Sequence, residues 1–490
     1  MRLVLLGTGG PDGWPSPFCD CVSCLSVAGT ADARGRTSVL VDSELLIGVD
    51  PAVLGSAGRF GVSVRRVRYL LLAGGERPAA VAAVVDSWLA ARPAVAATHL
   101  AADGSGEPGD GSGEPGPGLS AGAGWRVPVQ VVGPARAVDR CRAGMPAPDR
   151  PGVRWRGLPD GGTVQLGRYT VRLLPGSDLE NAPYEIRDGR TGGDGGARLL
   201  FAGGRGRLTP GAVDALVAAD GVDVALLGGN CHELPVAVAA LRRAGAVATG
   251  CRLIAVGGSH DNPPPSELAP RLAAWGVELL RDGADVTIQG GGPAGRRAGG
   301  SPRPPRTLVL GGARSGKSEW AEALLAAEPA VTYLATAPPR PGDPDWARRV
   351  AAHRERRLAH WRTVESAEVA GLLAAPPGPV LVDDLGNWLT RWLDAYGGWD
   401  GPAAPTGLAA VRDRMVELVA AWRGATTWVV AVSSEVGAGV VPATAAGRLF
   451  RDELGRLNRQ LAEASDQVVL VVAGLPMWLR GDPCRSPLQP

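Results

Sequence analysis

A glycine-rich segment in the second half of the chain constrains the fold more strongly than any other feature of the sequence. An apolar run from Leu308 to Leu310 precedes it, and an amphipathic stretch that includes Trp320 and Leu324 follows it. The segment consists of Gly311, Gly312, Ala313, Arg314, Ser315, Gly316, Lys317 and Ser318. Glycines let backbone N–H groups turn toward a phosphate, and a helix N-terminus adds partial positive charge. The spacing G-x-x-x-x-G-K-S therefore predicts a strand, a phosphate-binding loop and a helix, with the lysine on the β- and γ-phosphates and the serine hydroxyl on magnesium.

Lys317 is the only lysine in a chain with 51 residues of the Lys/Arg pair. An arginine side chain ends in a wide planar fork, whereas an ammonium is a compact charge on a flexible stem. A chain that uses arginine everywhere else and keeps lysine here indicates a loop in which the fork does not fit. The alternative is a chance glycine-rich turn in a chain with 71 glycines, and the flanking strand and helix patterns argue against it.

The length and charge of the chain limit the remaining possibilities. A chain of 490 residues is too long for one ordinary core, so we expect two domains or more. Its formal net charge is +2, and no block of like charge indicates nucleic acid or a membrane surface as a partner. The apolar run at the N-terminus is too short for a signal peptide, and no apolar stretch is long enough to span a membrane. We therefore expect a soluble cytoplasmic protein.

The first 289 residues alternate short apolar strands with helices. Arg2–Leu6, Ser38–Val41 and Tyr69–Leu72 are predicted strands, and Ala79–Ala91 is a predicted helix. Residues 103–118 contain GSGEPG twice without apolar content and are expected to form a disordered surface loop. With LGTGGPDGWPSPFCDCVSC at the start, this order resembles the metallo-β-lactamase fold, in the subgroup that includes phosphodiesterases of phosphonate metabolism. The resemblance implies an α/β domain of the αββα sandwich type.

The residues that bind the catalytic metals in such hydrolases are missing from the sequence. Active members carry H-x-H-x-D-H after the strand that corresponds to Tyr69–Leu72, whereas residues 73–79 read AGGERPA here. The bridging aspartate corresponds to Gly204, and the last histidine corresponds to Gly257. Glycine, alanine and proline offer no side-chain donor to a metal, so residues 1–289 are expected to be catalytically inactive. An active metal-dependent phosphodiesterase remains the alternative.

Three of the seven cysteines, Cys19, Cys21 and Cys24, lie within six residues. In a reducing compartment such a cluster indicates a metal site rather than disulfides. In the phosphodiesterases that the sequence resembles, three cysteines and a histidine hold a structural zinc, and the resemblance assigns the place of that histidine to His260. A Cys₃His set suits closed tetrahedral zinc. The alternative is that the thiols are simply buried and that His260 only ends a strand at a turn.

Residues 290–305 read GGGPAGRRAGGSPRPP and cannot contribute to a core. They predict a flexible linker between one domain at 1–289 and another at 306–490. In the second domain apolar strands alternate with helices, which predicts a mainly parallel sheet with ligands at the carboxyl edge of its strands. After the strand at Leu308, the predicted strands, the last of which closes the domain, are Val331–Leu334, Val380–Val382, Trp428–Ser433 and Val468–Val472.

Several motifs of this second domain occur together in one family. They are GGARSGKSEWAE, YLATA, HWRTVE, LVDDL and SEVGAGVVP, and in combination they resemble adenosylcobinamide kinase/adenosylcobinamide-phosphate guanylyltransferase. The chain departs from the family pattern at Ser434 and Arg391, where asparagine is usual. The resemblance implies two reactions. A nucleoside triphosphate phosphorylates adenosylcobinamide, and GMP is then transferred from GTP through a guanylyl-histidine.

The resemblance also implies roles for particular residues. By position His353 is the guanylylated histidine, and imidazole suits that role because it can attack an α-phosphate and later leave. Lys317 is the second implied catalytic residue, and Ser318 and Asp383 are the implied ligands of Mg²⁺. Besides the phosphate loop, the nucleotide-binding residues that the resemblance implies are Ala335, Thr336, Ala337, Arg357, His360, Glu365 and Asp383. For His353 the alternative is an ordinary solvated helix residue among arginines.

The expected partners are adenosylcobinamide and the nucleoside triphosphates ATP and GTP, and a homo-oligomer formed through residues 306–490 is also expected. A protein of another class remains as a hypothesis, namely a nucleotide-binding scaffold in which both halves are vestigial. The intact phosphate loop argues against that hypothesis.

Overall fold

The computed structural model describes residues 1–90, 128–149, 152–190, 196–203, 208–219, 221–288, 305–337, 342, 348, 351, 354–355, 357–403 and 405–481. The chain divides into two compact units. The first comprises Met1–Asn230, Ile254–Pro264 and Leu280–Gly292, and the second comprises Cys231–Leu253, Pro265–Leu279 and Pro293–Pro490. Two segments that precede residue 290 therefore join the unit with the phosphate loop. The predicted loop at 103–118 and most of the predicted linker at 290–305 lie outside the described residues, so the linker and the domain boundaries stay predictions.

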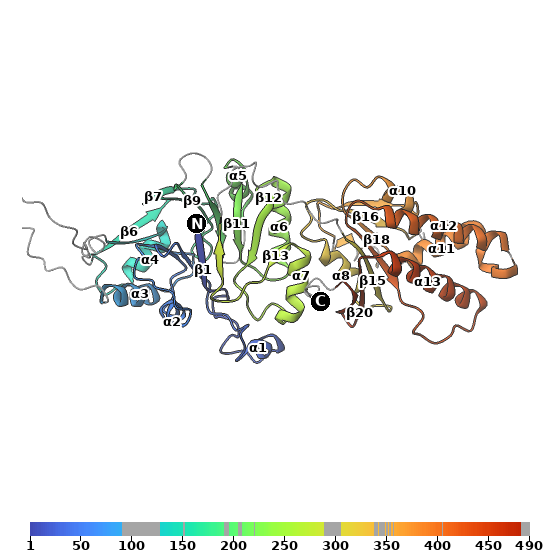
Figure 1. The fold of residues 1–490 in the computed structure, drawn as a ribbon, viewed down its shortest axis with the longest axis horizontal. Coiled ribbons are helices and arrows are strands. Elements are labelled where there is room, and N and C mark those ends of the chain that lie inside the picture. The colour runs from blue at the N-terminus through green and yellow to red at the C-terminus, as the bar shows by residue number, and fades with distance from the viewer. Residues whose placement is uncertain are drawn as a thin grey trace, which may run out of the picture. The chain divides into compact units, whose positions relative to one another are not determined.

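Residues before the linker form two seven-stranded sheets (Figure 1). The first sheet has the order β14-β1-β2-β3-β4-β5-β6, and the second has the order β13-β12-β11-β10-β9-β8-β7. The strands of the first are β1 (Arg2–Gly7), β2 (Ser38–Val41), β3 (Leu45–Ile47), β4 (Tyr69–Leu71), β5 (Val129–Pro134), β6 (Val153–Leu158) and β14 (Asp285–Thr287). Those of the second are β7 (Thr163–Leu166), β8 (Tyr169–Leu173), β9 (Tyr184–Asp188), β10 (Arg198–Ala202), β11 (Val222–Leu227), β12 (Val247–Ala255) and β13 (Val277–Glu278).

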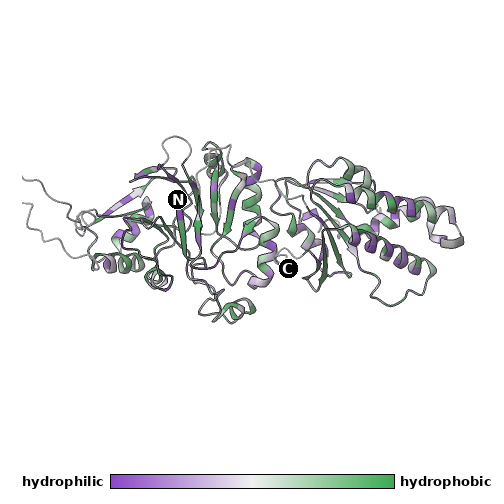
Figure 2. Ribbon diagram, in the orientation of Figure 1, coloured by the Kyte–Doolittle hydropathy of each residue, from purple (hydrophilic) through white to green (hydrophobic). Residues whose placement is uncertain are grey.

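The two sheets share one hydrophobic core, because successive side chains of a strand point to opposite faces of its sheet. Leu3 and Leu5 of β1 lie in this core together with Phe201 of β10, whereas Val4 packs on the other face with three helices. These helices are α2 (Ala52–Arg59), α3 (Pro78–Ala90) and α4 (Ala135–Ala143). Figure 2 shows the strands as predominantly hydrophobic, as expected for sheets covered on both faces.

A helix also lies beside the second sheet. It is α5 (Pro210–Val217), and Arg172 of β8 donates to the carbonyl of Ala215 in this helix at 3.4 Å (Figure 1). Thr209 caps its first turn, since its hydroxyl accepts from the N–H of Ala212 at 3.1 Å. Helices outside two packed sheets make an αββα sandwich, so the fold class predicted for this part of the chain is confirmed.

The second unit contains a seven-stranded sheet with the order β17-β16-β18-β19-β15-β20-β21. The strands are β15 (Arg306–Gly311), β16 (Thr332–Ala335), β17 (Arg362–Glu365), β18 (Val380–Asp383), β19 (Val429–Ser434), β20 (Gln467–Val472) and β21 (Leu475–Arg480). Each pair of neighbours is parallel except β20 and β21, which run antiparallel. The predicted mainly parallel sheet is confirmed, and its parallel strands end at one edge.

Helices cover both faces of this sheet. Trp320 and Leu324 of α8 (Lys317–Leu324) pack in the core of one face, and Trp388 and Leu457 pack in the core of the other. The helices of the second face are α10 (Val369–Ala374), α11 (Leu385–Tyr396), α12 (Pro405–Gly424) and α13 (Ala445–Ala464), and a 3₁₀ helix spans Gly398–Ala403.

One prediction about this sheet is wrong. The strand predicted at Val468–Val472 does not close the domain, because β21 follows it after a tight turn at Ala473 and Gly474. Both turn residues have positive φ, 50° and 82°, which matches the twist of antiparallel strands joined by two residues. The sheet therefore has an antiparallel edge strand that the sequence reading did not include.

The segments from before the linker contact the end of α8 within the second unit. The indole N–H of Trp275 donates to the carbonyl of Ala323 at 2.8 Å, and Arg242 donates to the carbonyl of Ala327 at 3.1 Å. These donors come from the end of α6 (Glu233–Ala244) and from the residue after α7 (Pro265–Ala274). Because the last carbonyls of a helix lack partners within it, the contact of Trp275 stabilises the end of α8, whereas Arg242 contacts the turn that follows the helix.

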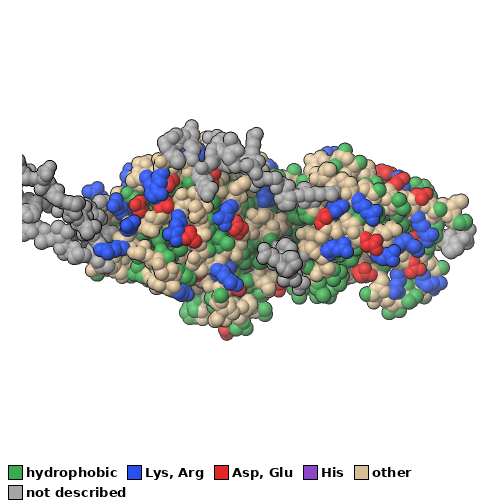
Figure 3. Space-filling model, in the orientation of Figure 1, with side chains coloured by type: hydrophobic (Ala, Val, Ile, Leu, Met, Phe, Trp, Pro, Cys, Tyr) green, Lys and Arg blue, Asp and Glu red, His purple; other side chains and the backbone are tan. Residues whose placement is uncertain are grey.

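On the face drawn in Figure 3, basic and acidic side chains are interspersed, as a formal net charge of +2 would suggest. None of the helices that the structure describes is long and apolar enough to cross a membrane.

Candidate functional site

The phosphate loop joins β15 to α8 in a conformation that requires its glycines. A Cβ atom on Gly311 would lie 2.4 Å from Ser315 Oγ and 2.8 Å from the carbonyl of Val471. Gly316 has a φ of 88°, which residues other than glycine rarely adopt. The loop therefore folds tightly against the end of β20, and the N–H of Gly474 donates to the carbonyl of Ser315 at 2.7 Å.

The side chain of Lys317 bends back over this loop. Its Nζ donates to the carbonyl of Gly312 at 3.3 Å, and the exposed residues Gly312, Ala313 and Arg314 form the outer part of the loop. In this position the ammonium group stands where phosphates would lie against the N-terminus of α8. The structure thus places the predicted lysine at the predicted loop.

Ser318 and Asp383, the magnesium ligands that the resemblance implies, contact each other. Ser318 is the second residue of α8, and its hydroxyl donates to Asp383 Oδ1 at 3.2 Å. Asp383 ends β18, which lies two strands from β15 in the sheet. A hydroxyl and a carboxylate are the hard oxygen ligands that Mg²⁺ prefers, so this pair fits a magnesium ion held beside a phosphate.

Asp384 adds a second carboxylate to this place. Its Oδ1 caps α11 by accepting from the N–H of Asn387 at 2.7 Å. Burial, followed by the charge of Asp383, raises the pKa of Asp384 to about 6, and Lys317 acts in the opposite direction. Two adjacent carboxylates with one ammonium nearby leave negative charge at this site, which a divalent cation would offset.

Ala335, the last residue of β16, and the two residues that follow it lie at the same edge of the sheet. Thr336 is fully buried, and its hydroxyl donates to the carbonyl of Asp384 at 2.6 Å, while its N–H donates to the carbonyl of Asp383 at 3.2 Å. Ala335 pairs with Asp383 in the sheet. Ala337 follows with its side chain partly exposed. Thr336 therefore fixes the backbone of the two aspartates, and no side chain of this segment other than that of Thr336 can donate a hydrogen bond.

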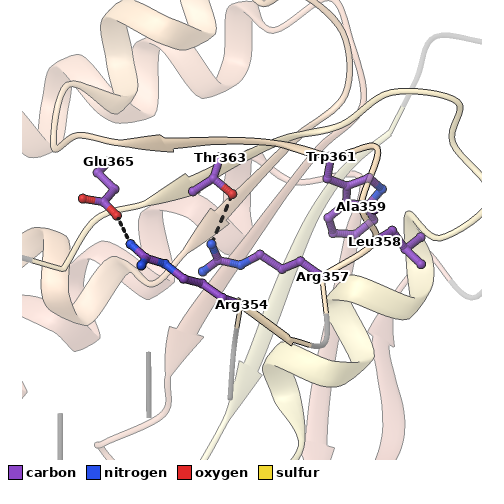
Figure 4. Close-up of a pocket in the computed structure, with 7 residues that line it drawn as sticks. All are labelled: Arg354, Arg357, Leu358, Ala359, Trp361, Thr363 and Glu365. Carbon is purple, nitrogen blue, oxygen red and sulfur yellow. Dashed lines mark hydrogen bonds and ion pairs between the residues drawn. The ribbon is translucent and has the colours of Figure 1, made fainter. Parts of the chain in front are cut away.

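A pocket of about 460 Å³ opens near the end of the sheet that carries β17 (Figure 4). Arg354 and Arg357 line one side of it, and Arg354 donates to Glu365 at 2.7 Å, whereas Arg357 donates to the hydroxyl of Thr363 at 3.2 Å. The remaining lining residues are Leu358, Ala359 and Trp361. The two guanidinium groups provide donors for phosphate oxygens, whereas the indole of Trp361 is buried in the core on this face of the sheet.

The structure separates the two candidate histidines. His360 lies outside the residues that line the pocket, and its Nε2 is 3.3 Å from the carbonyl of Glu328. Burial lowers the pKa of His360. His353, the predicted guanylylated residue, lies outside the described residues. Of the other predicted nucleotide-binding residues, Arg357 and Glu365 line the pocket.

The sequence reading did not include Tyr333 of β16. This tyrosine is almost fully buried, and its hydroxyl donates to Asp383 Oδ2. The guanidinium carbon of Arg357 lies 3.7 Å from the centroid of its ring. The available signal was a tyrosine within a buried strand, because the hydroxyl of a buried tyrosine usually finds a hydrogen-bond partner.

The predicted zinc ligands come together in the first unit. One ligand atom of each residue, Cys19, Cys21, Cys24 and His260, lies within 4.8 Å of the others. Cys21 is the N-cap of α1 (Val22–Val27), and Cys24 lies within this helix. The N–H of Cys24 donates to Cys21 Sγ at 3.4 Å, and this hydrogen bond lowers the pKa of Cys21. Burial raises the pKa of Cys24 to about 11. Three thiols and one imidazole at these separations fit tetrahedral zinc.

Residues 73–79, which would carry catalytic ligands in a metal-dependent hydrolase, form a loop whose own side chain and backbone are hydrogen-bonded to each other. Glu76 is buried, and its two carboxylate oxygens accept from the N–H groups of Ala73 and Gly74 at 2.6 and 2.9 Å. Burial nevertheless raises the pKa of Glu76. A Cβ atom on Gly74 would lie 2.6 Å from the backbone of Glu180, so a histidine does not fit there. Gly257 is likewise in place without a ligand group, and Gly204 lies outside the described residues.

The phosphate loop joins β15 to α8 at the carboxyl edge of a mainly parallel sheet, and Lys317, Ser318 and Asp383 lie at this edge. This arrangement defines a P-loop nucleotide-binding protein. A family model described as cobinamide kinase / cobinamide phosphate guanyltransferase matches residues 307–479. The bifunctional adenosylcobalamin biosynthesis protein CobP of Pseudomonas aeruginosa is 44% identical over 183 residues, which are 36% of this chain and 99% of that protein. CobU of Salmonella typhimurium is 40% identical over 183 residues, covering 35% of this chain and 98% of that protein. The chain belongs to this family, as the sequence reading expected.

Two solved structures are similar to the N-terminal part of the chain. Zn²⁺-bound PqqB from Methylobacterium extorquens matches with a TM-score of 0.38 and 18% identity, over 59% of this chain and 100% of that chain. A diphosphatase of the PhnP family matches with a TM-score of 0.41 and 18% identity, over 58% of this chain and 97% of that chain. With TM-scores below 0.5 neither likeness contributes to the assignment, which rests on the sheet order and layers described above.

Proposed function

We propose that the protein is a bifunctional transferase of cobalamin biosynthesis. It phosphorylates adenosylcobinamide and then transfers GMP from GTP to give adenosylcobinamide-GDP. The observation that carries this proposal is the phosphate loop, in which Lys317 contacts the carbonyl of Gly312 and Ser318 contacts Asp383. The chain that contains this loop belongs to the cobinamide kinase / cobinamide phosphate guanyltransferase family.

In the first reaction the phosphate loop holds the nucleoside triphosphate. N–H groups of residues 312–318 and the N-terminus of α8 bind the phosphates, and Lys317 neutralises the charge that develops on the γ-phosphoryl group. The accepting hydroxyl of adenosylcobinamide attacks the γ-phosphorus, and the bond to the β-phosphate oxygen breaks. Positioning and charge supply the catalysis, because a phosphoryl transfer of this kind needs no covalent step on the protein.

Ser318 and Asp383 would hold magnesium during this reaction. The bound ion neutralises phosphate charge and orients the oxygens for in-line transfer. The support for these two ligands is their 3.2 Å contact beside the phosphate loop.

In the second reaction His353 is the nucleophile. Its imidazole attacks the α-phosphorus of GTP, pyrophosphate leaves, and the phosphate of the first product then displaces the histidine and takes the GMP. The pocket of Figure 4 supports a nucleotide site on this side of the sheet. Arg354 and Arg357 would bind phosphate oxygens after the ion pair of Arg354 with Glu365 opens.

For the N-terminal part we propose a structural zinc and no hydrolase activity. The four clustered side chains Cys19, Cys21, Cys24 and His260 would hold the zinc and so fix the loop that contains α1. The absence of hydrolase activity is supported by the loop at residues 73–79, in which the carboxylate of Glu76 already accepts hydrogen bonds from the backbone. Phosphodiesterase activity in the purified protein would favour the alternative function.

The partners that follow from this proposal are adenosylcobinamide, ATP and GTP, in the cytoplasm. A homo-oligomer through residues 306–490 is part of the proposal. It is supported by β21, which ends the sheet and exposes Leu475, Met477 and Leu479. An edge strand with apolar side chains can pair with a strand of another chain.

Incubation of the purified protein with α-labelled GTP tests the proposal. We expect a covalent GMP adduct that is stable in base and labile in acid, with release of one pyrophosphate per adduct. In parallel, γ-labelled ATP should label adenosylcobinamide. Nucleotide binding without either reaction would show that the chain is a scaffold and would overturn the proposal.

A further inference from the structure

Asp383 is held from two sides by hydroxyl groups. Ser318 Oγ donates to Asp383 Oδ1 at 3.2 Å, and the hydroxyl of Tyr333 donates to Asp383 Oδ2. Ser318 belongs to the phosphate-loop helix, whereas Tyr333 belongs to β16, the strand that pairs with β18. The two oxygens of the carboxylate therefore have different partners from different elements.

The bond from Tyr333 decides which oxygen faces the nucleotide. A carboxylate rotates about a single torsion, and a donor on one oxygen fixes the position of the other. With Oδ2 engaged by Tyr333, Oδ1 is directed to Ser318 at the start of α8. Outer partners of this kind orient the side chains that bind a metal, and their loss commonly weakens metal binding 10- to 100-fold.

The environment of Tyr333 keeps its hydroxyl a donor. The residue is 1% exposed, and its hydroxyl lies against the carboxylate of Asp383. A neutral phenol donates its proton to the carboxylate, and a phenylalanine in its place would leave Oδ2 without this partner.

The ring of Tyr333 is held by a residue of the neighbouring pocket. The guanidinium carbon of Arg357 lies 3.7 Å from the ring centroid, a favourable cation–π contact. Arg357 lines the pocket and donates to Thr363 of β17. Tyr333 thus contacts the pocket through its ring and the phosphate-loop carboxylate through its hydroxyl.

We propose that Tyr333 is a positioning residue for phosphoryl transfer, whose hydroxyl orients Asp383 toward Ser318 and magnesium and whose ring is fixed by Arg357. The pocket and the phosphate loop are therefore coupled through one side chain. This inference rests on the proposed placement of magnesium at Ser318 and Asp383.

The test measures metal binding directly. Mn²⁺ replaces Mg²⁺, a non-hydrolysable GTP analogue is present at saturation, and free Mn²⁺ is followed by its electron paramagnetic resonance signal. Tyr333→Phe should raise the Kd for Mn²⁺ about 10-fold. The affinity for a fluorescent nucleotide in EDTA should stay unchanged, because the phosphate loop itself is intact. Kinase activity should be restored by excess Mg²⁺, which is a change in the metal requirement rather than in kcat.

Two further variants separate the possible failures. Tyr184→Phe removes another buried tyrosine hydroxyl, which donates to the carbonyl of Leu72 at 2.6 Å in the first unit, and it should leave the Kd for Mn²⁺ unchanged. Asp383→Asn should weaken Mn²⁺ binding more than Tyr333→Phe does. Normal Mn²⁺ binding in Asp383→Asn would refute the proposed magnesium site. Weak binding in Asp383→Asn with normal binding in Tyr333→Phe, or a loss of nucleotide affinity in EDTA in Tyr333→Phe, would overturn the positioning role.

A double variant tests the contribution of Arg357. If Arg357 acts on the metal through the ring of Tyr333, Arg357→Met should raise the Kd for Mn²⁺, and the double variant with Tyr333→Phe should match Tyr333→Phe alone. Effects that multiply in the double variant would show that the two residues act independently, and would overturn the coupling of pocket and loop.

Discussion

Lys317 places a compact charge against the backbone of its own loop. Its Nζ contacts the carbonyl of Gly312, and the N–H of Gly474 donates to the carbonyl of Ser315 in the same loop. A guanidinium group is wider than an ammonium and directs its donors in a fixed plane. The position therefore demands both a positive charge and a narrow end group.

Lys317→Ala should lower kcat/KM of the kinase reaction by about 100-fold or more, since a stabilising charge at the transferring phosphoryl group is lost. Lys317→Arg should be severely impaired as well. The measurement is steady-state phosphorylation of adenosylcobinamide, with Arg459→Lys on the exposed face of α13 as the matched control. Turnover of Lys317→Arg near that of the wild type would contradict the account of the loop.

His353→Ala should remove the GMP adduct and the release of pyrophosphate and leave phosphorylation of adenosylcobinamide measurable. Only the second reaction needs a nucleophile that later leaves. His360→Ala should have a milder effect, because His360 contacts the carbonyl of Glu328 and does not line the pocket. Both steps are assayed in both variants. An adduct that survives in His353→Ala and disappears in His360→Ala would identify the other histidine as the nucleophile.

At the scale of elements, the loop from Cys19 to Cys24 depends on the proposed zinc. Elemental analysis of the purified protein should find about one zinc per chain, and Cys21→Ser should lose it. Cys251→Ser is the control, since Cys251 lies outside the cluster. Removal of zinc by a chelator should increase proteolysis in residues 15–28. A zinc content unchanged in Cys21→Ser, or two metals per chain, would contradict this prediction.

The sequence predicted most elements of the second unit but neither of the two edge strands of its sheet, β17 and β21. β15, β16, β18, β19 and β20 follow apolar runs, which any buried parallel strand must contain. Residues 475–480 read LPMWLR, and their apolar side chains Leu475, Met477 and Leu479 are exposed. Such a strand is difficult to predict from the sequence, because it contains a proline and because its apolar side chains are exposed rather than buried.

The candidate site was predictable to the same extent. The spacing of the phosphate loop placed Lys317 and Ser318, because these residues are neighbours in the chain. Tyr333 was not predicted, because its contacts with Asp383 and Arg357 depend on the order of strands in the sheet. The cysteines were visible in the sequence as a cluster, whereas His260 required the resemblance, since it lies far from them in the chain.

At the scale of the whole molecule, β21 predicts an assembly. Met477→Lys introduces a charge on the exposed face of this edge strand and should shift the protein to monomers, as charged edge residues do in natural sheets. Light scattering coupled to size-exclusion chromatography measures the mass. Val416→Lys is the control, because Val416 is a similarly exposed apolar residue on α12. Unchanged mass in Met477→Lys would place the interface elsewhere.

The position of the single lysine also determines how the whole chain reacts with amine-directed reagents. Apart from the α-amino group, the Nζ of Lys317 is the only primary amine among 490 residues. Acylation of this amine therefore coincides with loss of the phosphate site, and bound nucleotide should shield it. The number of modified ε-amino groups per chain would therefore report the fraction of sites without nucleotide. Immobilisation through lysine would inactivate every molecule that it captures.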